Sequence, residues 1–296
     1  MDSFITNFMN ENRIAFFIIT GVLAFVGILW YAFENPAINP RLDAESYTII
    51  RKWDMPVELN EISGISWISN NKIACVQDEE GIIFIYNLDT ELVEKKINFG
   101  ESGDYEGLTV LDSTAYLMES SGKIFEVSNY LSPNFKTTAY QTPFSGKNNM
   151  ESLVVDSLNQ RLLFTVKDKD PNSNSFKGIY AFNIETKTTK ALPIIKISLN
   201  EGVFQSKDPD DDADTSSNFY PSELGINPKN GTYYVLEAKN PQLLILDSIG
   251  KPIKLHKLHK KSFSQPEGIT FAPDGTIYIS NEGKKGTANI LEVEFE

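Results

Sequence analysis

One short pattern occurs five times along this chain, and it restricts the fold more than any other feature of the sequence. Each copy starts with Ser or Glu, continues into an apolar run, and is followed by a polar turn and a second, alternating run. The first residues are 43, 45, 71 and 45 positions apart, so the copies share one period if the third interval contains an insertion. The copies begin at Ser63, Glu106, Glu151, Ser222 and Glu267.

A period of about 40–50 residues, with four short strands in each repeat, is typical of β-propeller blades. The sequence therefore predicts an all-β fold, a five-bladed β-propeller, with six blades as the alternative if the long third interval holds a degenerate blade. The last copy leaves room for only three strands before the end of the sequence. We expect residues 47–53 to supply the fourth strand and to close the ring.

An uncharged run of twenty residues, 14–33, precedes the repeats, and its length is that of a helix which crosses a bilayer. Arg13 before it, with Trp30 and Tyr31 at its far end, favours a cytoplasmic N-terminus. A cleaved signal peptide is the alternative, but its apolar core is usually shorter and ends in small residues. We expect a single-pass protein of the cell (inner) membrane with a periplasmic propeller, divided into residues 1–13 (cytoplasmic), 14–33 (transmembrane helix), 34–44 (linker) and 45–296 (propeller).

The formal net charge of −13 argues against nucleic acid as a partner, because both would be negative. It suits a cationic ligand or a divalent metal ion, and solubility alone explains it equally well. The sequence does not identify a protein or small-molecule ligand, and it leaves the oligomeric state open.

The first strand of each propeller blade lines the central channel, so the five repeated residues are expected to converge at one mouth of it. A second ring of mostly acidic residues follows 13–16 positions later in each copy. Clustered carboxylates repel one another and favour a hard cation, so we predict a Ca²⁺ site here. The candidate ligands are Glu106, Glu151, Glu267, Asp78, Glu119, Glu237 and Glu282, and Ser63, Ser222 and Lys167 are expected to line the channel beside them.

Three alternatives to this calcium site stay open. The repeated residues can instead bond backbone groups between blades, which is a purely structural role. An Asp-rich insertion, residues 200–219, carries Asp208, Asp210, Asp212 and Asp214 at calcium-loop spacing but lacks the turn glycine and the closing Glu. The third alternative is a metal-dependent hydrolase of the lactonase or phytase type that uses the carboxylate-lined channel.

Nucleophilic catalysis has little support in the sequence. The single cysteine, Cys75, lies in an alternating run and is expected to be a small core residue. The two histidines, His256 and His259, lie in a lysine-rich run that is expected to be an exposed outer strand. No Gly-x-Ser-x-Gly or phosphate-binding loop is found in the sequence, so the protein is expected to bind a ligand rather than to catalyse a reaction.

The order and spacing of four motifs resemble those of the SdiA-regulated (YjiK-like) family of bacterial membrane-associated proteins, relatives of NHL-repeat propellers. The resemblance extends over residues 45–296 and implies a five-bladed propeller with a bound calcium ion and no established catalysis. The insertion departs from the family pattern. The motifs are Glu61-Ile-Ser-Gly-Ile-Ser-Trp67, Asp104-Tyr-Glu-Gly-Leu108, Tyr220-Pro-Ser-Glu-Leu224 and Gln265-Pro-Glu-Gly-Ile-Thr-Phe271.

Overall fold

The computed structural model of the chain describes residues 22–27, 46–204, 219–283 and 286–296. The chain separates into two units, residues 1–46 and 47–296. In the first unit, residues 22–27 are helical and exposed. Of the helices within the described ranges, none has the length and apolar character needed to span a bilayer. Most of the predicted transmembrane segment 14–33 lies outside the described residues, so this segment stays a prediction.

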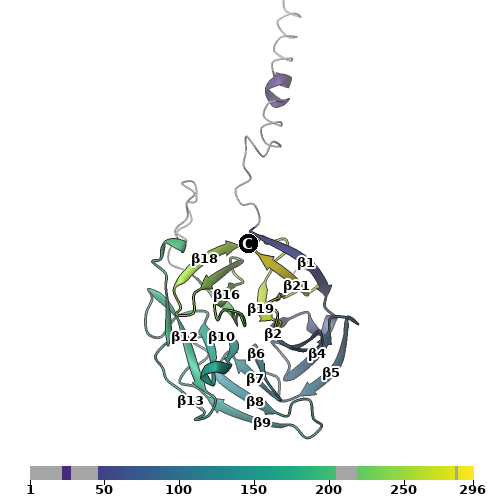
Figure 1. Cartoon of the computed structure of the whole chain (residues 1–296), viewed down its shortest axis with the longest axis vertical. Helices are drawn as coiled ribbons and strands as arrows, with labels where there is room; N and C mark the ends of the chain where they lie inside the picture. The colour runs from purple at the N-terminus through teal and green to yellow at the C-terminus, as the bar shows by residue number, and fades with distance from the viewer. Residues whose placement is uncertain (1–21, 28–45, 205–218, 284–285) are drawn as a thin grey trace, which may run out of the picture. The chain divides into compact units, whose positions relative to one another are not determined.

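Residues 47–296 form five antiparallel sheets around a common centre, which confirms the predicted five-bladed propeller (Figure 1). Blades 1 and 2 consist of β2 (Ile62–Ser69), β3 (Lys72–Gln77), β4 (Ile82–Asn87), β5 (Leu92–Asn98), β6 (Tyr105–Leu111), β7 (Thr114–Glu119), β8 (Lys123–Ser128) and β9 (Lys136–Gln141). Blade 3 consists of β10 (Met150–Asp156), β11 (Arg161–Val166), β12 (Phe176–Asn183), β13 (Thr188–Thr189) and β14 (Ile195–Ser198). Blades 4 and 5 consist of β15 (Pro221–Ile226), β16 (Tyr233–Glu237), β17 (Gln242–Leu246), β18 (Pro252–Lys257), β19 (Pro266–Phe271), β20 (Ile277–Asn281), β21 (Asn289–Phe295) and β1 (Tyr47–Asp54).

The first strands of the five blades, β2, β6, β10, β15 and β19, contact one another in sequence and surround the channel. Three short 3₁₀ helices, η1 (Val57–Leu59), η2 (Ser157–Asn159) and η3 (Gly202–Phe204), lie between strands. The long third interval adds β14, which pairs with β12 and so belongs to blade 3. The described residues therefore form no sixth blade, and the predicted calcium loop at Asp208–Asp214 lies outside them.

The ring closes where the sequence predicted. Strand β1 pairs with β21, from Tyr47 opposite Phe295 to Asp54 opposite Asn289, and so completes blade 5 with the N-terminal end of the unit. Trp53 is buried in β1, and its indole N–H donates a hydrogen bond to the Leu88 carbonyl of blade 1 at 2.8 Å. Closure thus joins three segments that are far apart in the sequence.

Five hydrophobic clusters fill the spaces between neighbouring blades, and all of them lie within residues 47–296. The propeller therefore contains its own core as well as its own closure. Cys75 is fully buried in the cluster between blades 5 and 1, as predicted, and burial raises the pKa of its thiol.

The lysine-rich run does form an outermost strand, β18, but one part of the prediction was wrong. His256 is buried there rather than exposed, and its ring packs edge-on against Phe295 at 4.9 Å. Burial lowers the pKa of His256 to about 4, with a smaller contribution from Lys254. The strand therefore alternates an inward histidine with outward lysines, which a count of polar residues does not reveal.

Candidate functional site: the channel mouth

A β-bulge interrupts the pairing of the first two strands in every blade. In four blades the bulge falls at the repeated residue, which is Ser63, Glu106, Ser222 or Glu267. In blade 3 it falls just after Glu151. Bulges re-aim side chains and commonly occur beside functional sites. The repeat in the sequence therefore corresponds to a repeated break in the sheet at the channel.

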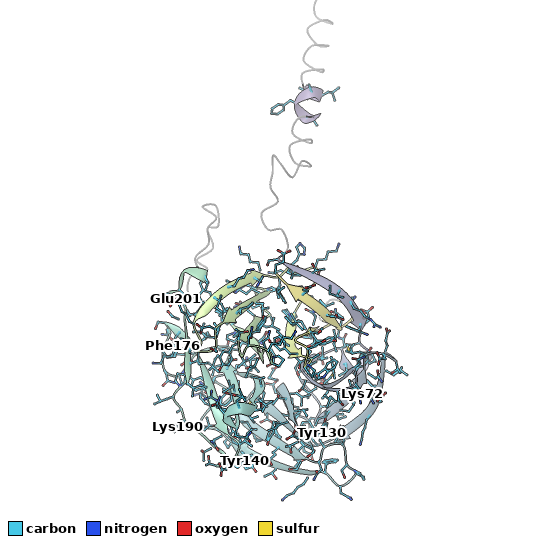
Figure 2. All side chains as sticks on the ribbon, viewed as in Figure 1. Lys72, Tyr130, Tyr140, Phe176, Lys190 and Glu201 are labelled. Carbon is cyan, nitrogen blue, oxygen red and sulfur yellow. The ribbon has the colours of Figure 1, made fainter. Side chains whose placement is uncertain are left out.

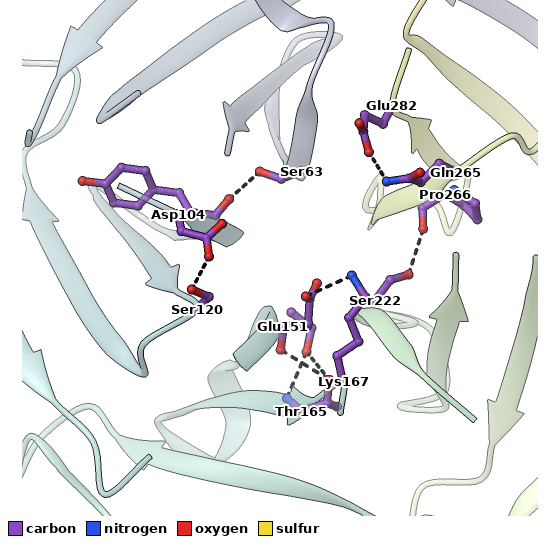
Figure 3. Close-up of polar contacts among 12 residues, drawn as sticks. Ser63, Asp104, Ser120, Glu151, Thr165, Lys167, Ser222, Gln265, Pro266 and Glu282 are labelled. Atoms are coloured by element: carbon purple, nitrogen blue, oxygen red, sulfur yellow. Dashed lines mark hydrogen bonds and ion pairs between the residues drawn. The ribbon is translucent and has the colours of Figure 1, made fainter. Parts of the chain in front are cut away.

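The two repeated serines join blades together. Ser63 Oγ donates a hydrogen bond to the Tyr105 carbonyl at 2.6 Å, and Ser222 Oγ donates to the Pro266 carbonyl at 2.8 Å (Figure 3). Each bond runs from one blade to the next. Ser63 and Ser222 therefore have the structural role that was one of the alternatives: each bonds a backbone group of the next blade.

A second set of ties between blades lies three positions further along the first strands. There, a hydroxyl of one blade accepts a hydrogen bond from a backbone N–H of the next blade at 2.8–3.1 Å. The accepting residues are Ser66, Thr109 and Thr270, and the donors are the amides of Val110, Val155 and Trp67 respectively. These ties satisfy backbone groups that strand pairing leaves open at the inner edge.

The repeated glutamates form one electrostatic cluster with Lys167. The ammonium of Lys167 lies 3.1 Å from Glu151 Oε1, and the Glu151 side chain is almost completely buried (Figure 3). Burial by itself lowers the pKa of Lys167, but Glu151, Glu267 and Glu106 raise it by more, so its net pKa is raised. Lys167 is therefore the cation of this cluster.

A fourth glutamate of the same cluster, Glu223, was not predicted, and it is buried. It occupies the position that is glycine in three other copies of the repeat. The residue predicted to line the channel in this copy was its neighbour, Ser222. Glu223 Oε1 accepts hydrogen bonds from the amides of Leu153, at 3.0 Å, and Leu224, at 2.8 Å. At the equivalent positions Gly64 and Gly107, the next blade approaches so closely that it leaves no room for a side chain. A glutamate at a position that is otherwise glycine is the signal in the sequence that would have identified Glu223.

Burial and mutual repulsion raise the pKa values of these carboxyls. The pKa of Glu106 is raised to about 8 by burial, with Lys167 lowering it and Glu267 raising it. The pKa of Glu151 is raised well above its usual range by burial and by Glu106. Burial also raises the pKa of Glu223, although its two backbone hydrogen bonds lower it. Glu106 consequently holds a proton near neutral pH.

Most of the predicted second ring does not join this cluster. Glu119 is the last residue of β7 and pairs with Lys123 at 3.3 Å; Glu237 ends β16 and accepts from Asn240 Nδ2 at 3.0 Å. Glu282 lies just beyond β20 and accepts from the Gln265 amide (Figure 3).

Asp78 and Lys167 also lie one residue beyond a strand, and both belong to the cluster: Lys167 pairs with Glu151, and the charge of Asp78 raises the pKa of Glu106. Burial, Glu61 and Glu282 raise the pKa of Asp78 to about 6. The five residues of the second ring therefore do not occupy equivalent positions. Two of them are the last residue of a strand, and three lie one residue beyond a strand.

The contacts of these carboxylates can be compared with the ligands that a calcium ion needs. Calcium takes six to eight oxygen ligands. Within the described ranges, no three His, Cys, Asp or Glu side chains come together in a way that would hold a metal ion. Glu151 Oε1 is occupied by Lys167, and Glu223 Oε1 by two amides. As arranged, these two carboxylate oxygens are therefore engaged by protein groups rather than turned toward a common metal position.

Comparison with known proteins supports the fold and a family. The SdiA-regulated family matches residues 43–284. No curated protein sequence matches the chain. Among solved structures, glutaminyl cyclase from Myxococcus xanthus is similar with a TM-score of 0.56 and 13% identity, over 84% of this chain and 96% of that one. A Bacteroides thetaiotaomicron protein of unknown function has a TM-score of 0.52 and 12% identity, over 85% and 73% of the two chains. Likenesses at such low identity show the fold alone.

Proposed function

Because the chain belongs to the SdiA-regulated family and its propeller gathers four glutamates, three of them buried, around one lysine, we propose that it is a membrane-anchored module that binds a cationic ligand. The glutamate cluster is the single observation that supports this proposal. With all five groups charged, Glu106, Glu151, Glu223, Glu267 and Lys167 would carry a net charge of −3. No observation favours a reaction at this cluster over binding.

The contacts favour an organic cation, an ammonium or guanidinium group, over a metal ion. Such a group needs hydrogen-bond acceptors rather than a full shell of oxygen ligands, and the buried Oε2 atoms of Glu151 and Glu223 have no hydrogen-bond partner in the described part of the chain. Calcium stays a prediction, and its binding requires Lys167 to leave Glu151.

Cation binding is expected to release a proton, because Glu106, whose pKa is raised to about 8, holds one near neutral pH and must ionise to receive a positive charge. We expect the affinity for putrescine or arginine methyl ester to rise between pH 6 and pH 8, by up to about tenfold per pH unit for each proton released. Isothermal titration in two buffers of different ionisation enthalpy measures both the affinity and the number of protons.

The double variant Glu106→Gln, Glu151→Gln is expected to lose this binding. The matched control, Glu185→Gln with Glu294→Gln, changes the net charge equally at two exposed positions and should bind normally. Equal binding by both pairs would contradict the proposed site. Calcium that stabilises the intact protein but not the channel variant would support the calcium prediction instead. A metal-dependent lactonase or phosphatase activity, abolished by the same channel variant, would favour the hydrolase alternative.

The membrane anchor is tested separately. If residues 14–33 stay as a helix in the bilayer, the full chain should remain with membranes in alkaline carbonate, because insertion of an apolar helix does not depend on charge. A chain lacking residues 1–43 should be released. A mature N-terminus beyond residue 33 would instead identify the segment as a cleaved signal peptide. A C-terminal reporter that is active only in the cytoplasm would reverse the proposed topology.

A further inference from the structure

A basic and apolar surface lies on the rim of the otherwise acidic propeller. Residues 239–261 contain six lysines and one acidic residue, Asp247, so this stretch carries a net charge of +5. The rest of the chain then carries −18, since the total is −13. We call the following set the basic rim: Lys196, Lys251, Lys254, Lys257, Lys260, Lys261, Leu192, Ile194, Ile249 and Ile253.

Two segments of different blades build the basic rim. The loop before β14 and the turn before β18 form the walls of one shallow groove of about 430 Å³. They are in close contact, because a Cβ placed on Gly250 would lie only 2.3 Å from the Ile195 side chain. The Asp247 carboxylate accepts hydrogen bonds from the amides of Ile249 and Lys251 and so fixes this turn. Ile194, Lys196, Ile249 and Lys251 therefore share one groove, and the remaining rim residues continue from it along the loop before β14 and along β18 with the residues that follow it.

Large aliphatic side chains stand exposed between these lysines. Ile249 is 81% exposed, Leu192 67% and Ile253 55%. With Ile194, they make up four of the nine large exposed hydrophobic residues described in the propeller. Lysines can keep their charge at the headgroups while apolar side chains enter the interface below them, so this mixture is typical of surfaces that lie on anionic membranes.

The start of the propeller lies beside this surface. The Tyr47 hydroxyl, at the first residue of β1, accepts a hydrogen bond from the His259 amide at 3.1 Å. The Tyr47 ring also packs edge-on against Phe263 at 5.3 Å. In Figure 1, β1 and β18 are neighbours on the rim. Residues 34–46, which join Tyr47 to the apolar segment, span at most about 45 Å when fully extended.

We propose that the basic rim rests on the anionic headgroups of a membrane, where the apolar side chains of residues 192, 194, 249 and 253 enter the interface. This proposal rests on the proposed membrane anchoring, which would keep the rim within reach of the bilayer. Acidic residues beside it include Asp247, in the turn itself, Glu201, in the same groove, and Glu296, whose main-chain carbonyl accepts a hydrogen bond from Lys254. In Figure 2, Glu201 is labelled at the upper left, on the blade 3 side of the rim.

Docking through the basic rim would fix the direction of the channel relative to the membrane. Strand β18 is the outermost strand of blade 4, so a propeller that rests on it has its channel axis roughly parallel to the membrane plane. Both mouths of the channel then stay clear of the lipid. A soluble cation would have free access to the buried glutamates, while the rest of the propeller, with its net charge of opposite sign to the rim, would face away from the bilayer.

Vesicle sedimentation tests the proposal on residues 44–296, which contain the complete core and ring closure. Vesicles of phosphatidylcholine are compared with vesicles that also contain 30% phosphatidylglycerol. We expect binding to the anionic vesicles only, and its loss in high salt. Each lysine near an anionic surface contributes about fivefold in affinity, so Lys251→Gln, Lys254→Gln and Lys257→Gln together should weaken binding about 100-fold.

The matched control replaces Lys136, Lys147 and Lys169, all exposed and outside the rim, by Gln. It makes the same change in net charge and should bind as the unmodified domain does. Ile249→Ser, at an exposed position, should also weaken binding, and melting curves check that each variant is folded. Equal weakening by both lysine triples, or no binding to anionic vesicles, would overturn the proposal. Binding to polyglutamate but not to vesicles would overturn it in favour of an acidic protein partner.

The outcomes separate this proposal from the proposed anchor and channel function. Carbonate extraction of the full chain reports on residues 14–33 and does not depend on the lysines. Vesicle binding by residues 44–296 reports on the basic rim and does not depend on Glu106 or Glu151. A chain that fails one test and passes the other would therefore show which of the two inferences is wrong.

Discussion

Deletion of residues 44–54 is expected to unfold the entire propeller rather than one blade. The deletion removes β1, which completes blade 5, and it takes Tyr47 and Trp53 out of two different inter-blade clusters. Loss of a large buried aromatic side chain typically costs about 3–5 kcal/mol. Two such losses amount to most of the roughly 5–15 kcal/mol by which a folded domain is stable. Circular dichroism and thermal unfolding measure this result.

The control is deletion of residues 1–43 alone, which leaves β1 and all five described clusters intact. That variant should melt at the temperature of the full chain, because none of the removed residues belongs to the described core. Equal stability of the two truncated proteins would show that β1 does not close the ring.

The free energy of unfolding is expected to fall as the pH rises from 6.5 to 8. Glu106 keeps its proton to about pH 8 in the folded protein but loses it near pH 4.5 when unfolded. The folded state therefore binds more protons in this interval, so stability decreases as pH rises. One pKa unit corresponds to about 1.4 kcal/mol, and Glu106 alone thus contributes a loss of roughly 2 kcal/mol. Glu151 and Glu223 act in the same direction, because their pKa values are also raised.

Urea unfolding at several pH values measures this dependence. The variant Glu106→Gln should show a smaller loss, since glutamine has no proton to release, whereas Glu185→Gln should behave as the unmodified protein. His256 has the opposite dependence: its lowered pKa makes stability rise between about pH 4 and pH 6.5, so the chosen interval avoids it. A free energy of unfolding that is constant or rises from pH 6.5 to 8 would contradict the assignment of a proton-holding cluster.

The sequence predicted most residues of the channel cluster, but it did not predict which of them face the channel. The repeat selected Glu106, Glu151, Glu267 and Lys167, because each lies at the inner end of a blade strand. It also selected Ser63 and Ser222, whose hydroxyls turn to backbone carbonyls of the next blade. Nothing in the spacing distinguishes a side chain that faces the channel from one that bonds a neighbouring blade.

Aligning the repeats by residue type missed Glu223 and wrongly placed Glu119, Glu237 and Glu282 in the channel cluster. Glu223 stands one position after the repeated residue, and its side chain reaches back to an amide of blade 3, which depends on the approach of two blades. Glu119, Glu237 and Glu282 have the spacing of channel residues but have partners on their own blades. The contacts of Glu119 and Glu237 lie within turns, and that of Glu282 joins two strand ends of blade 5, which the sequence pattern does not encode.

The sequence predicted the propeller fold, the order of its blades and the closing strand, and the structure decided for five blades over six by pairing β14 with β12. These features follow from a period, because each repeat must bury its apolar faces against the next and the last must meet the first. Only the three-dimensional structure shows that Lys167 pairs with Glu151, that Glu223 joins the cluster, that His256 turns inward, and that distant lysines and isoleucines share one rim. Such pairings depend on bulges and on distances between blades, and a linear spacing carries no information about either.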